Sequence, residues 1–319
     1  MNDQLGERSK PRRKLGRGLS DVSHVFLSGA KPPQPEAETS GLTQDLETRA
    51  LEAEDAPTES SVWLPDATYI SVTSGERVRG KSLLSANLAF SLRSKGYRVT
   101  LVNADPDQPD VLSITGCVEG GMRADSLVTN EAFGELPVVT IYGGRRSPRE
   151  SGLEVNEPLA AAGREARLVV SDTSPLADTS YGIWRLSSLV IVITEPEIDS
   201  MRSAYVTIKR VHSAAPGTRI GLIVNRAASQ ADGEQCFRKI SGVSRDFLKI
   251  NLRNYGIIMR DQVAKHAGER KVPLLGAFPD SKASECVESI ARLILMDESA
   301  IARRRTEVRP VECALREGE

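Results

Sequence analysis

The feature that most constrains the fold is a series of short, almost uninterrupted apolar runs. Two of them, ARLVVSDTS (residues 166–174) and SSLVIVITEPE (residues 187–197), are rich in β-branched residues. A strand with one solvated face alternates between apolar and polar residues, whereas a strand covered on both faces is apolar almost throughout. These runs therefore predict strands of a sheet that lies inside the protein.

Strand-like and helix-like segments alternate along the chain. Five further segments are predicted to be strands: residues 67–74, 97–105, 136–144, 218–227 and 254–259. Between and after them, KSLLSANLAFSLRSKG (residues 81–96) is an amphipathic segment that stops at a glycine, and ASECVESIARLILM (residues 283–296) predicts a terminal helix. This alternation predicts an α/β fold with a doubly wound, mainly parallel sheet and helices on both faces.

Composition divides the chain into three parts. Residues 1–62 are poor in large apolar groups and rich in Pro, Glu, Ser and Thr, so we expect a disordered tail. Residues 63–297 carry the α/β pattern, and residues 298–319 form a polar C-terminal tail. Within the N-terminal tail, residues 18–28 place apolar side chains on one helical face. They are either a chance cluster in a solvated tail or a short helix that docks on a protein partner.

The bulk composition argues against several classes of protein. The 319 residues include 42 basic and 43 acidic side chains, so no overall field favours nucleic acid or an anionic membrane. The 4 cysteines and 3 histidines are scattered, which argues against a metal site or a disulfide framework. No apolar run approaches the ~20 residues of a membrane-spanning helix. We expect a cytoplasmic protein, and peripheral attachment to the inner membrane stays open.

The segment GERVRGKS, residues 75–82, matches the phosphate-binding pattern GxxxxGK[ST]. It follows a predicted strand and opens a predicted helix, which is the context that this pattern requires. Gly75 and Gly80 let the backbone curl so that its N–H groups point at phosphate oxygens, and the helix adds its positive end. We therefore predict a P-loop NTPase fold.

Each position of this loop has an expected role. Lys81 is predicted to reach the β- and γ-phosphates, and the Ser82 hydroxyl to bind Mg²⁺. The cofactors expected are ATP and Mg²⁺. The positions assigned to the nucleotide cradle are Gly75, Val78, Arg79, Gly80, Lys81, Ser82 and Leu83.

Two carboxylates stand at predicted strand ends where such a site needs them. Asp172 ends the run RLVVSD and is predicted to hold Mg²⁺ through water. Asp105 ends the strand that follows the loop helix, where a carboxylate orients the attacking water. With Lys81, Asp105 is our candidate catalytic residue. The alternative for both carboxylates is a structural cap at the end of a strand.

With these residues in place, the chain resembles the ParA/MinD group of deviant P-loop ATPases over residues 66–296. Two segments are most similar to the FlhG/FleN branch of flagellar-number regulators: VIVITEPEIDSMRSAYVTIKR, and residues 246–294, which begin DFLKINLRNYGIIMRD. The resemblance implies an ATP-dependent homodimer. It also implies that Asn225, in IVNR, contacts the adenine base.

The chain departs from that group's pattern at several positions. Glu76 stands where the group has a signature lysine that reaches the phosphates of the partner subunit, and Arg77 stands where it has a glycine. Arg77 or Arg79 is the alternative source of the missing cation. Asn103 replaces the first Asp of a DxD pair whose second member is Asp105. A C-terminal amphipathic membrane helix of the MinD type is not evident in residues 298–319.

The resemblance and its departures leave several functions open. The first is an ATP-binding switch that positions or counts a cellular structure, with weak or altered ATPase activity. The second is a pseudo-ATPase adaptor that recruits a partner through its N-terminal helix. A bacterial tyrosine kinase is disfavoured because residues 256–319 contain no tyrosine cluster. A DNA-partitioning ATPase is disfavoured by the neutral charge. Membrane and DNA association both stay open.

Overall fold

The computed structural model describes residues 67–307, apart from residue 77 and residues 106–109, 117–124, 131–133 and 142–155. Within these residues, an eight-stranded sheet has the strand order β3-β4-β2-β5-β1-β6-β7-β8. Neighbouring strands are parallel except β3 and β4, which are antiparallel. The predicted tail, residues 1–62, and its candidate docking helix, residues 18–28, lie outside the described residues.

The seven predicted strands are all present, and the sheet has one more. The strands are β1 (Thr68–Ser74), β2 (Val99–Ala104), β3 (Asp125–Asn130), β4 (Gly134–Thr140), β5 (Leu168–Thr173), β6 (Leu189–Thr194), β7 (Arg219–Ala227) and β8 (Arg253–Met259). The additional strand, β3 (DSLVTN), was not predicted from the sequence. An edge strand has a neighbour on one side only, so β3 does not need the continuous apolar run that identifies the central strands.

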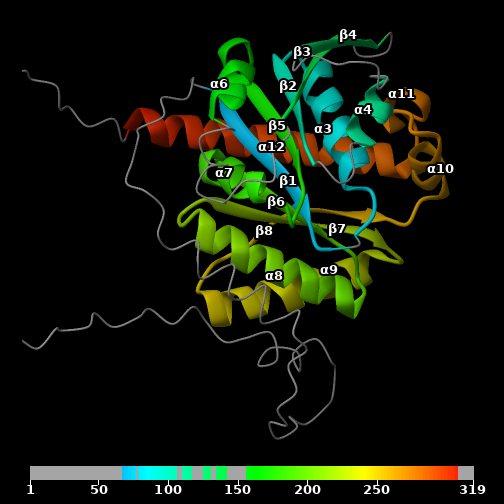
Figure 1. The fold of residues 1–319 in the computed structure, drawn as a ribbon. Coiled ribbons are helices and arrows are strands. Elements are labelled where there is room, and N and C mark those ends of the chain that lie inside the picture. Colours follow the sequence, from blue (N-terminus) through cyan, green and yellow to red (C-terminus); the bar gives the residue numbers. More distant parts are fainter. Residues whose placement is uncertain are drawn as a thin grey trace, which may run out of the picture.

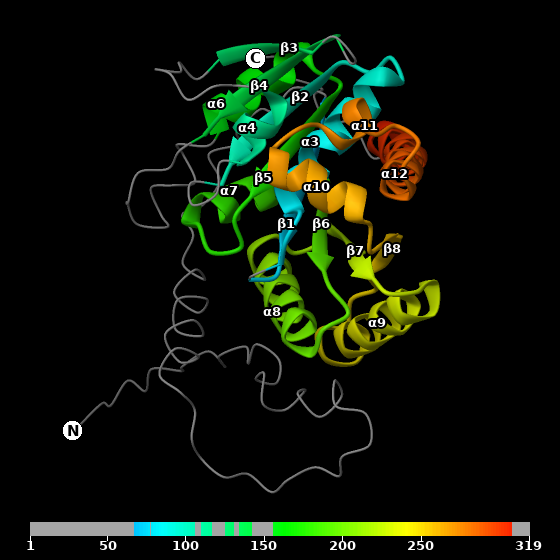
Figure 2. The same ribbon diagram turned by 90° about the vertical axis from the view of Figure 1, so that its right-hand side faces the viewer.

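Helices cover both faces of the sheet, as predicted (Figures 1 and 2). One face carries α3 (Lys81–Ser94), α4 (Asp110–Thr115), α10 (Gln262–Arg270), α11 (Leu274–Ala277) and α12 (Lys282–Glu307). The other carries α6 (Asn156–Glu165), α7 (Asp178–Leu186), α8 (Ile198–Ala214) and α9 (Gln230–Val243), which continues into the π-helical turn η1 (Ser244–Leu248). The terminal helix α12 continues to Glu307, past residue 297, where the sequence analysis ends the domain. No helix among the described residues meets the length and apolarity needed to span a bilayer.

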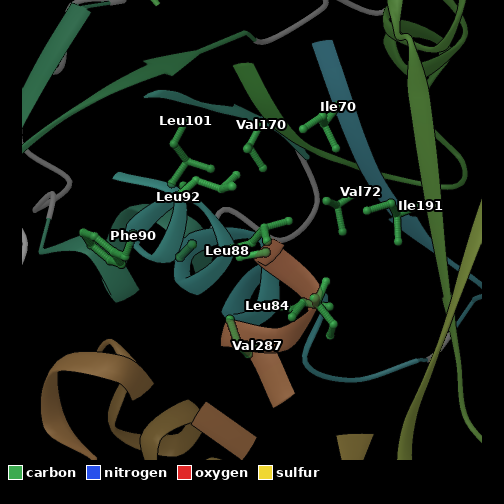
Figure 3. Packing of buried hydrophobic residues seen from close by; sticks show 14 of the residues in the cluster. Ile70, Val72, Leu84, Leu88, Phe90, Leu92, Leu101, Val170, Ile191 and Val287 are labelled. Atoms are coloured by element: carbon green, nitrogen blue, oxygen red, sulfur yellow. The ribbon is translucent and has the colours of Figure 1, made fainter. Parts of the chain in front are cut away.

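The largest core cluster lies between the sheet and α3. Leu84 and Leu88 of α3 point toward Ile70 and Val72 of β1. Val287 of α12 packs in the same cluster, beside α3 (Figure 3). Successive residues of each central strand face opposite sides of the sheet and are buried on both. This explains why the strands read as unbroken apolar runs.

The sheet brings three strand ends together beside the loop. β1 runs directly into the loop, and α3 begins at Lys81. β1 lies between β5 and β6, with Val72 opposite Asp172 and Ser74 opposite Ile193. Because parallel strands end at the same edge, the residues that follow β5 and β6 flank the loop on its two sides.

At the opposite edge, a buried carboxylate fastens α12 to the sheet. Asp297 is 3% exposed and accepts a hydrogen bond from the Tyr255 hydroxyl at 2.6 Å. Its Oδ1 pairs with Arg253 at 2.5 Å and lies 4.0 Å from Arg219. Burial, together with the bond to Asp297, raises the pKa of Tyr255, so this hydroxyl remains a donor at every physiological pH.

We expect Asp297→Ala to lower the free energy of unfolding by about 2 kcal/mol, because the buried Tyr255 hydroxyl loses its acceptor. The two arginines are partly solvated, which keeps the loss below that for a fully buried pair. Urea unfolding measures this change. The matched control is Met296→Ala, at a neighbouring position that is 66% exposed, with an expected change within about 0.5 kcal/mol. Equal stability of the two variants would contradict this role for Asp297.

Candidate phosphate-binding site

The two loop glycines sit where other residues do not fit. Gly80 has φ 86°, in the left-handed region that favours glycine, and caps the start of α3. A Cβ on Gly75 would lie 2.7 Å from the Ser203 Oγ and 2.9 Å from the Ala204 nitrogen, both on α8. The loop is thus pressed against α8, and Gly75 permits this approach.

Lys81 bridges the two carboxylates that the sequence analysis selected. Its Nζ lies 2.8 Å from Asp172 Oδ1 and 3.0 Å from Asp105 Oδ2. All three side chains are buried, at 5%, 0% and 3% exposure for Lys81, Asp172 and Asp105. Residues from three separate segments, the loop and the ends of β2 and β5, therefore meet in one ionic cluster.

The charge state of this cluster follows from its geometry. Burial on its own would lower the pKa of Lys81, but the charges and hydrogen bonds of Asp172 and Asp105 outweigh it, and the net pKa is raised above the ordinary 10.5. The ammonium is therefore present throughout the neutral range. The cluster holds one positive and two negative charges, so negative charge is in excess. It therefore favours the binding of a further cation.

Asp172 accepts from hydroxyls as well as from Lys81. Ser82 Oγ donates to its Oδ2 at 2.7 Å, and Ser85 Oγ lies 2.8 Å from its Oδ1. The single Ser85 proton is shared with a second acceptor, the Lys81 carbonyl, at 3.0 Å. Ser85 was missed from the sequence, although its position one helical turn after Lys81 places it on the same helix face.

Ser82 and Asp172 form a donor set that suits Mg²⁺. Both offer hard oxygen ligands, and they are already in contact. Magnesium in nucleotide sites is usually held by one or two such side chains together with phosphate oxygens. The residues present therefore fit the ion that the sequence analysis predicted.

Asn103 lies next to this cluster. It pairs in register with Asp172 across β2 and β5 and is fully buried. Neither atom of its amide has a hydrogen-bond partner within the described part of the chain. A buried amide without hydrogen-bond partners lowers the free energy of unfolding by about 1–3 kcal/mol. A stabilising role therefore does not explain the presence of Asn103.

The backbone N–H and the backbone carbonyl of Arg79 each have a side-chain hydrogen-bond partner. Its N–H donates to Glu195 Oε1 at 3.2 Å, and its carbonyl accepts from Asn225 Nδ2 at 3.1 Å. Glu195 follows β6 and Asn225 lies on β7, so the two strands on one side of β1 secure the loop. The structure thus brings Asn225 to the loop itself, whereas its predicted contact with a base stays a prediction.

The remaining loop residues differ in their surroundings. Val78 and Leu83 pack partly against the main core cluster, and the Val78 N–H donates to the Gly75 carbonyl at 3.4 Å. Glu76 is exposed, and its backbone N–H donates to Ser203 Oγ. Arg77, one of the two alternative cations, lies outside the described residues. Arg79, the other, has an exposed side chain.

Glu195 and Ser203 were also missed from the sequence. Both lie more than 100 residues from the loop in the chain and reach it only because β6 is the neighbour of β1. The available signal was the acidic residue at the end of the apolar run SSLVIVITE, in the same strand-end position that identified Asp172.

Comparisons with known proteins agree with this geometry. The model of the CobQ/CobB/MinD/ParA nucleotide binding domain matches residues 70–274. Among curated relatives, the antiactivator FleN of Pseudomonas aeruginosa is 27% identical over 238 residues, which cover 70% of this chain and 85% of FleN. The flagellum site-determining protein YlxH of Helicobacter pylori is 25% identical over 242 residues, covering 71% and 81%.

Solved structures show the same fold at lower identity. MinD of Aquifex aeolicus, in its complex with MinC, superposes with a TM-score of 0.58 at 19% identity and covers 72% of this chain and 96% of its own. MinD of Pyrococcus horikoshii, complexed with Mg-ADP, gives 0.57 at 17%, with the same coverage. The fold, the P-loop and a family match over more than half of the sequence agree, and the chain belongs to the CobQ/CobB/MinD/ParA family of nucleotide-binding proteins.

Proposed function

We propose that the protein is an ATP-binding switch of the MinD/ParA type that positions a cellular structure or sets its number, with weak or altered ATPase activity. The observation that carries the proposal is the cluster at the loop. One lysine bridges two strand-end carboxylates, and one of these also holds the loop serine. Relatives named as a flagellar site-determining protein and as the antiactivator FleN support the positioning or number-setting role.

The cluster suggests how a nucleotide acts on this site. When phosphates bind, Lys81 exchanges its carboxylate partners for phosphate oxygens. Asp172 and Ser82 would then be the residues that hold Mg²⁺, and Asp105 would be available to orient a water molecule. Bound Mg²⁺ would supply charge stabilisation at the phosphates. One side chain would thus couple nucleotide binding to the release of both acidic groups.

A second candidate function is a nucleotide-bound adaptor without turnover. It is favoured by Glu76, whose acidic side chain stands at the exposed end of the loop where the resemblance implies a lysine. On this account, nucleotide would stabilise the fold and the N-terminal segment would recruit a protein partner.

Phosphate release by the purified full chain with Mg-ATP, alone and with liposomes or DNA, distinguishes the switch from the adaptor. Turnover of ATP supports the switch, and binding without turnover supports the adaptor.

We expect Glu76→Lys to strengthen ATP-dependent homodimerisation about tenfold, equivalent to ~1.4 kcal/mol. The substitution replaces a carboxylate that would repel a partner's phosphates with the cation that the family pattern uses. Sedimentation velocity with Mg-ATP measures the change. Glu165→Lys is the control, because it is a charge reversal of the same size at an exposed position just before β5, at the sheet edge opposite the loop. Coincident monomer–dimer curves for Glu76→Lys and the parent would mean that Glu76 does not face the phosphates.

A further inference from the structure

Glu195 places a buried carboxylate against the phosphate-binding loop. It directly follows β6, is 7% exposed, and its Oε1 accepts the Arg79 N–H at 3.2 Å. Arg79 immediately precedes Gly80-Lys81-Ser82, so its N–H belongs to the row of donors that a P-loop turns toward phosphate oxygens. A protein carboxylate therefore holds a donor that the phosphate chain of a nucleotide would use.

The Glu195 carboxylate also forms an ion pair with Arg226. Arg226 Nη1 lies 3.7 Å from the same Glu195 oxygen. Arg226 has φ 56°, a left-handed conformation that is uncommon outside glycine, and its N–H donates to Asn225 Oδ1 at 3.0 Å. This turn at the end of β7 keeps the guanidinium beside Glu195, although the side chain itself is only partly buried, at 38% exposure.

The backbone of Glu195 has contacts that do not involve its carboxylate. The Glu195 carbonyl accepts from the Thr194 hydroxyl at 3.3 Å and lies 3.8 Å from Cys236 Sγ on α9. Asn225 separately holds the Arg79 carbonyl, so the loop keeps one support when the Glu195 contact is broken. Only the side chain needs to rotate away from the Arg79 N–H.

We propose that Glu195 competes with nucleotide phosphate for the loop, and that Arg226 holds the carboxylate once phosphate has displaced it. The proposal rests on the proposed function, because it concerns the same nucleotide site. A carboxylate and a phosphate cannot both accept the Arg79 N–H, and they repel each other at short range in a partly desolvated site. Glu195 thereby sets the affinity of the loop for di- and triphosphates, independently of the exposed Glu76.

The first test is Glu195→Gln, which keeps the shape and an acceptor oxygen but removes the negative charge. We expect the Kd values for Mg-ADP and Mg-ATP to fall about tenfold, while the weak binding of adenosine is unchanged. Isothermal titration of the full chain measures both. The matched control is Glu197→Gln, which neutralises an exposed carboxylate two residues away with no side-chain capping bond. It is expected to leave all affinities unchanged.

The second test is a double-mutant cycle with Arg226→Gln. In the parent background, this substitution is expected to weaken Mg-ADP binding several-fold, because the displaced carboxylate loses its partner. In the Glu195→Gln background, it is expected to have little effect. Equal weakening in both backgrounds would show that Arg226 contacts phosphate itself, which overturns its assignment to Glu195.

The outcomes separate this proposal from the proposed function. Unchanged or weaker ADP binding by a folded Glu195→Gln variant would overturn the competition, since Glu195 would then only brace the loop. If the parent fails to bind nucleotide at millimolar concentration but Glu195→Gln binds, the competition is supported and the proposed ATP-binding function of the parent fails. If neither binds at millimolar ADP, the proposed function fails and the competition fails with it. Thermal unfolding of each variant verifies that it is folded.

Discussion

Lys81→Met is expected to lower the free energy of unfolding of the nucleotide-free protein by about 3–5 kcal/mol, the range for leaving buried charges without a partner. Asp172 and Asp105 would face each other in the interior with no cation between them. Methionine keeps the aliphatic stem, so the change isolates the charge. The same variant should lose all stabilisation by Mg-ATP, because the phosphates lose their main counter-charge. Urea unfolding with and without Mg-ATP measures both effects.

The control for this prediction is Lys95→Met, at the C-cap of the same helix. Lys95 also pairs with a carboxylate, Glu288, but both side chains are partly exposed, so we expect a loss within about 1 kcal/mol. Adding Asp105→Asn to Lys81→Met should recover part of the stability by removing one buried charge. Losses of equal size for the two lysines would contradict the buried-cluster account, as would stabilisation of Lys81→Met by Mg-ATP.

The pH dependence of this pairing has a defined sign. The folded-state pKa of Lys81 is raised above its ordinary 10.5. Its stabilisation is therefore fully present below pH 10.5 and is lost only as the pH rises through the folded-state value. From pH 6 to 9, the titration of Lys81 should therefore contribute no pH dependence to the free energy of unfolding of the parent, as urea unfolding at each pH measures.

Asp172→Asn is expected to remove the Mg²⁺ dependence of nucleotide binding and to destabilise the fold by about 3 kcal/mol. Asp172 is fully buried and receives the Lys81 ammonium and the hydroxyls of Ser82 and Ser85. The amide nitrogen of asparagine is a donor, so it cannot accept from these groups. ATP titrations with Mg²⁺ and with EDTA test the first effect, and urea unfolding tests the second.

Asp280→Asn is the matched control for Asp172→Asn, because it makes the same chemical change at an exposed position outside the site. It should keep both the stability and the Mg²⁺ dependence of the parent. If Asp172→Asn retained a full Mg²⁺ effect on ATP affinity, Asp172 would not be part of the metal site, and its role would be limited to holding Lys81 and the two serines.

Much of the architecture was predictable, because a strand that is buried on both faces of the sheet has a continuous apolar sequence. The runs 166–174 and 187–197 are β5 and β6, and the alternation of strands with helices predicted that neighbouring strands run parallel. The strand β3 left no such trace, because it lies at the sheet edge. The extension of α12 to Glu307 also escaped prediction, since its final turns lack the apolar periodicity on which the boundary was drawn.

The site was predictable where residues are local to the loop or end a recognisable strand. Lys81, Ser82, Asp105 and Asp172 meet as the strand pattern implied. What the sequence did not predict is the pairing of Lys81 with both carboxylates. That pairing follows from charge: once the fold has buried an ammonium beside two carboxylates, the ammonium pairs with both, and one negative charge remains in excess.

Contacts that depend on the order of the strands in the sheet could not be predicted from local sequence patterns. Glu195 meets Arg79 because β6 lies beside β1, and Ser203 meets Glu76 because α8 packs under the loop. No spacing in the sequence specifies these neighbours. They become visible only when the order of the sheet is known.

The most direct test of the central claim is calorimetric titration of the full chain with Mg-ATP, Mg-ADP and adenosine. The account predicts binding of one Mg-ATP or Mg-ADP per chain, with adenosine at least about a hundredfold weaker, a difference of ~2.7 kcal/mol that the phosphate contacts supply. It also predicts weaker ATP binding when EDTA removes Mg²⁺. No heat of binding at millimolar Mg-ATP, or equal affinity for adenosine and ATP, would contradict it.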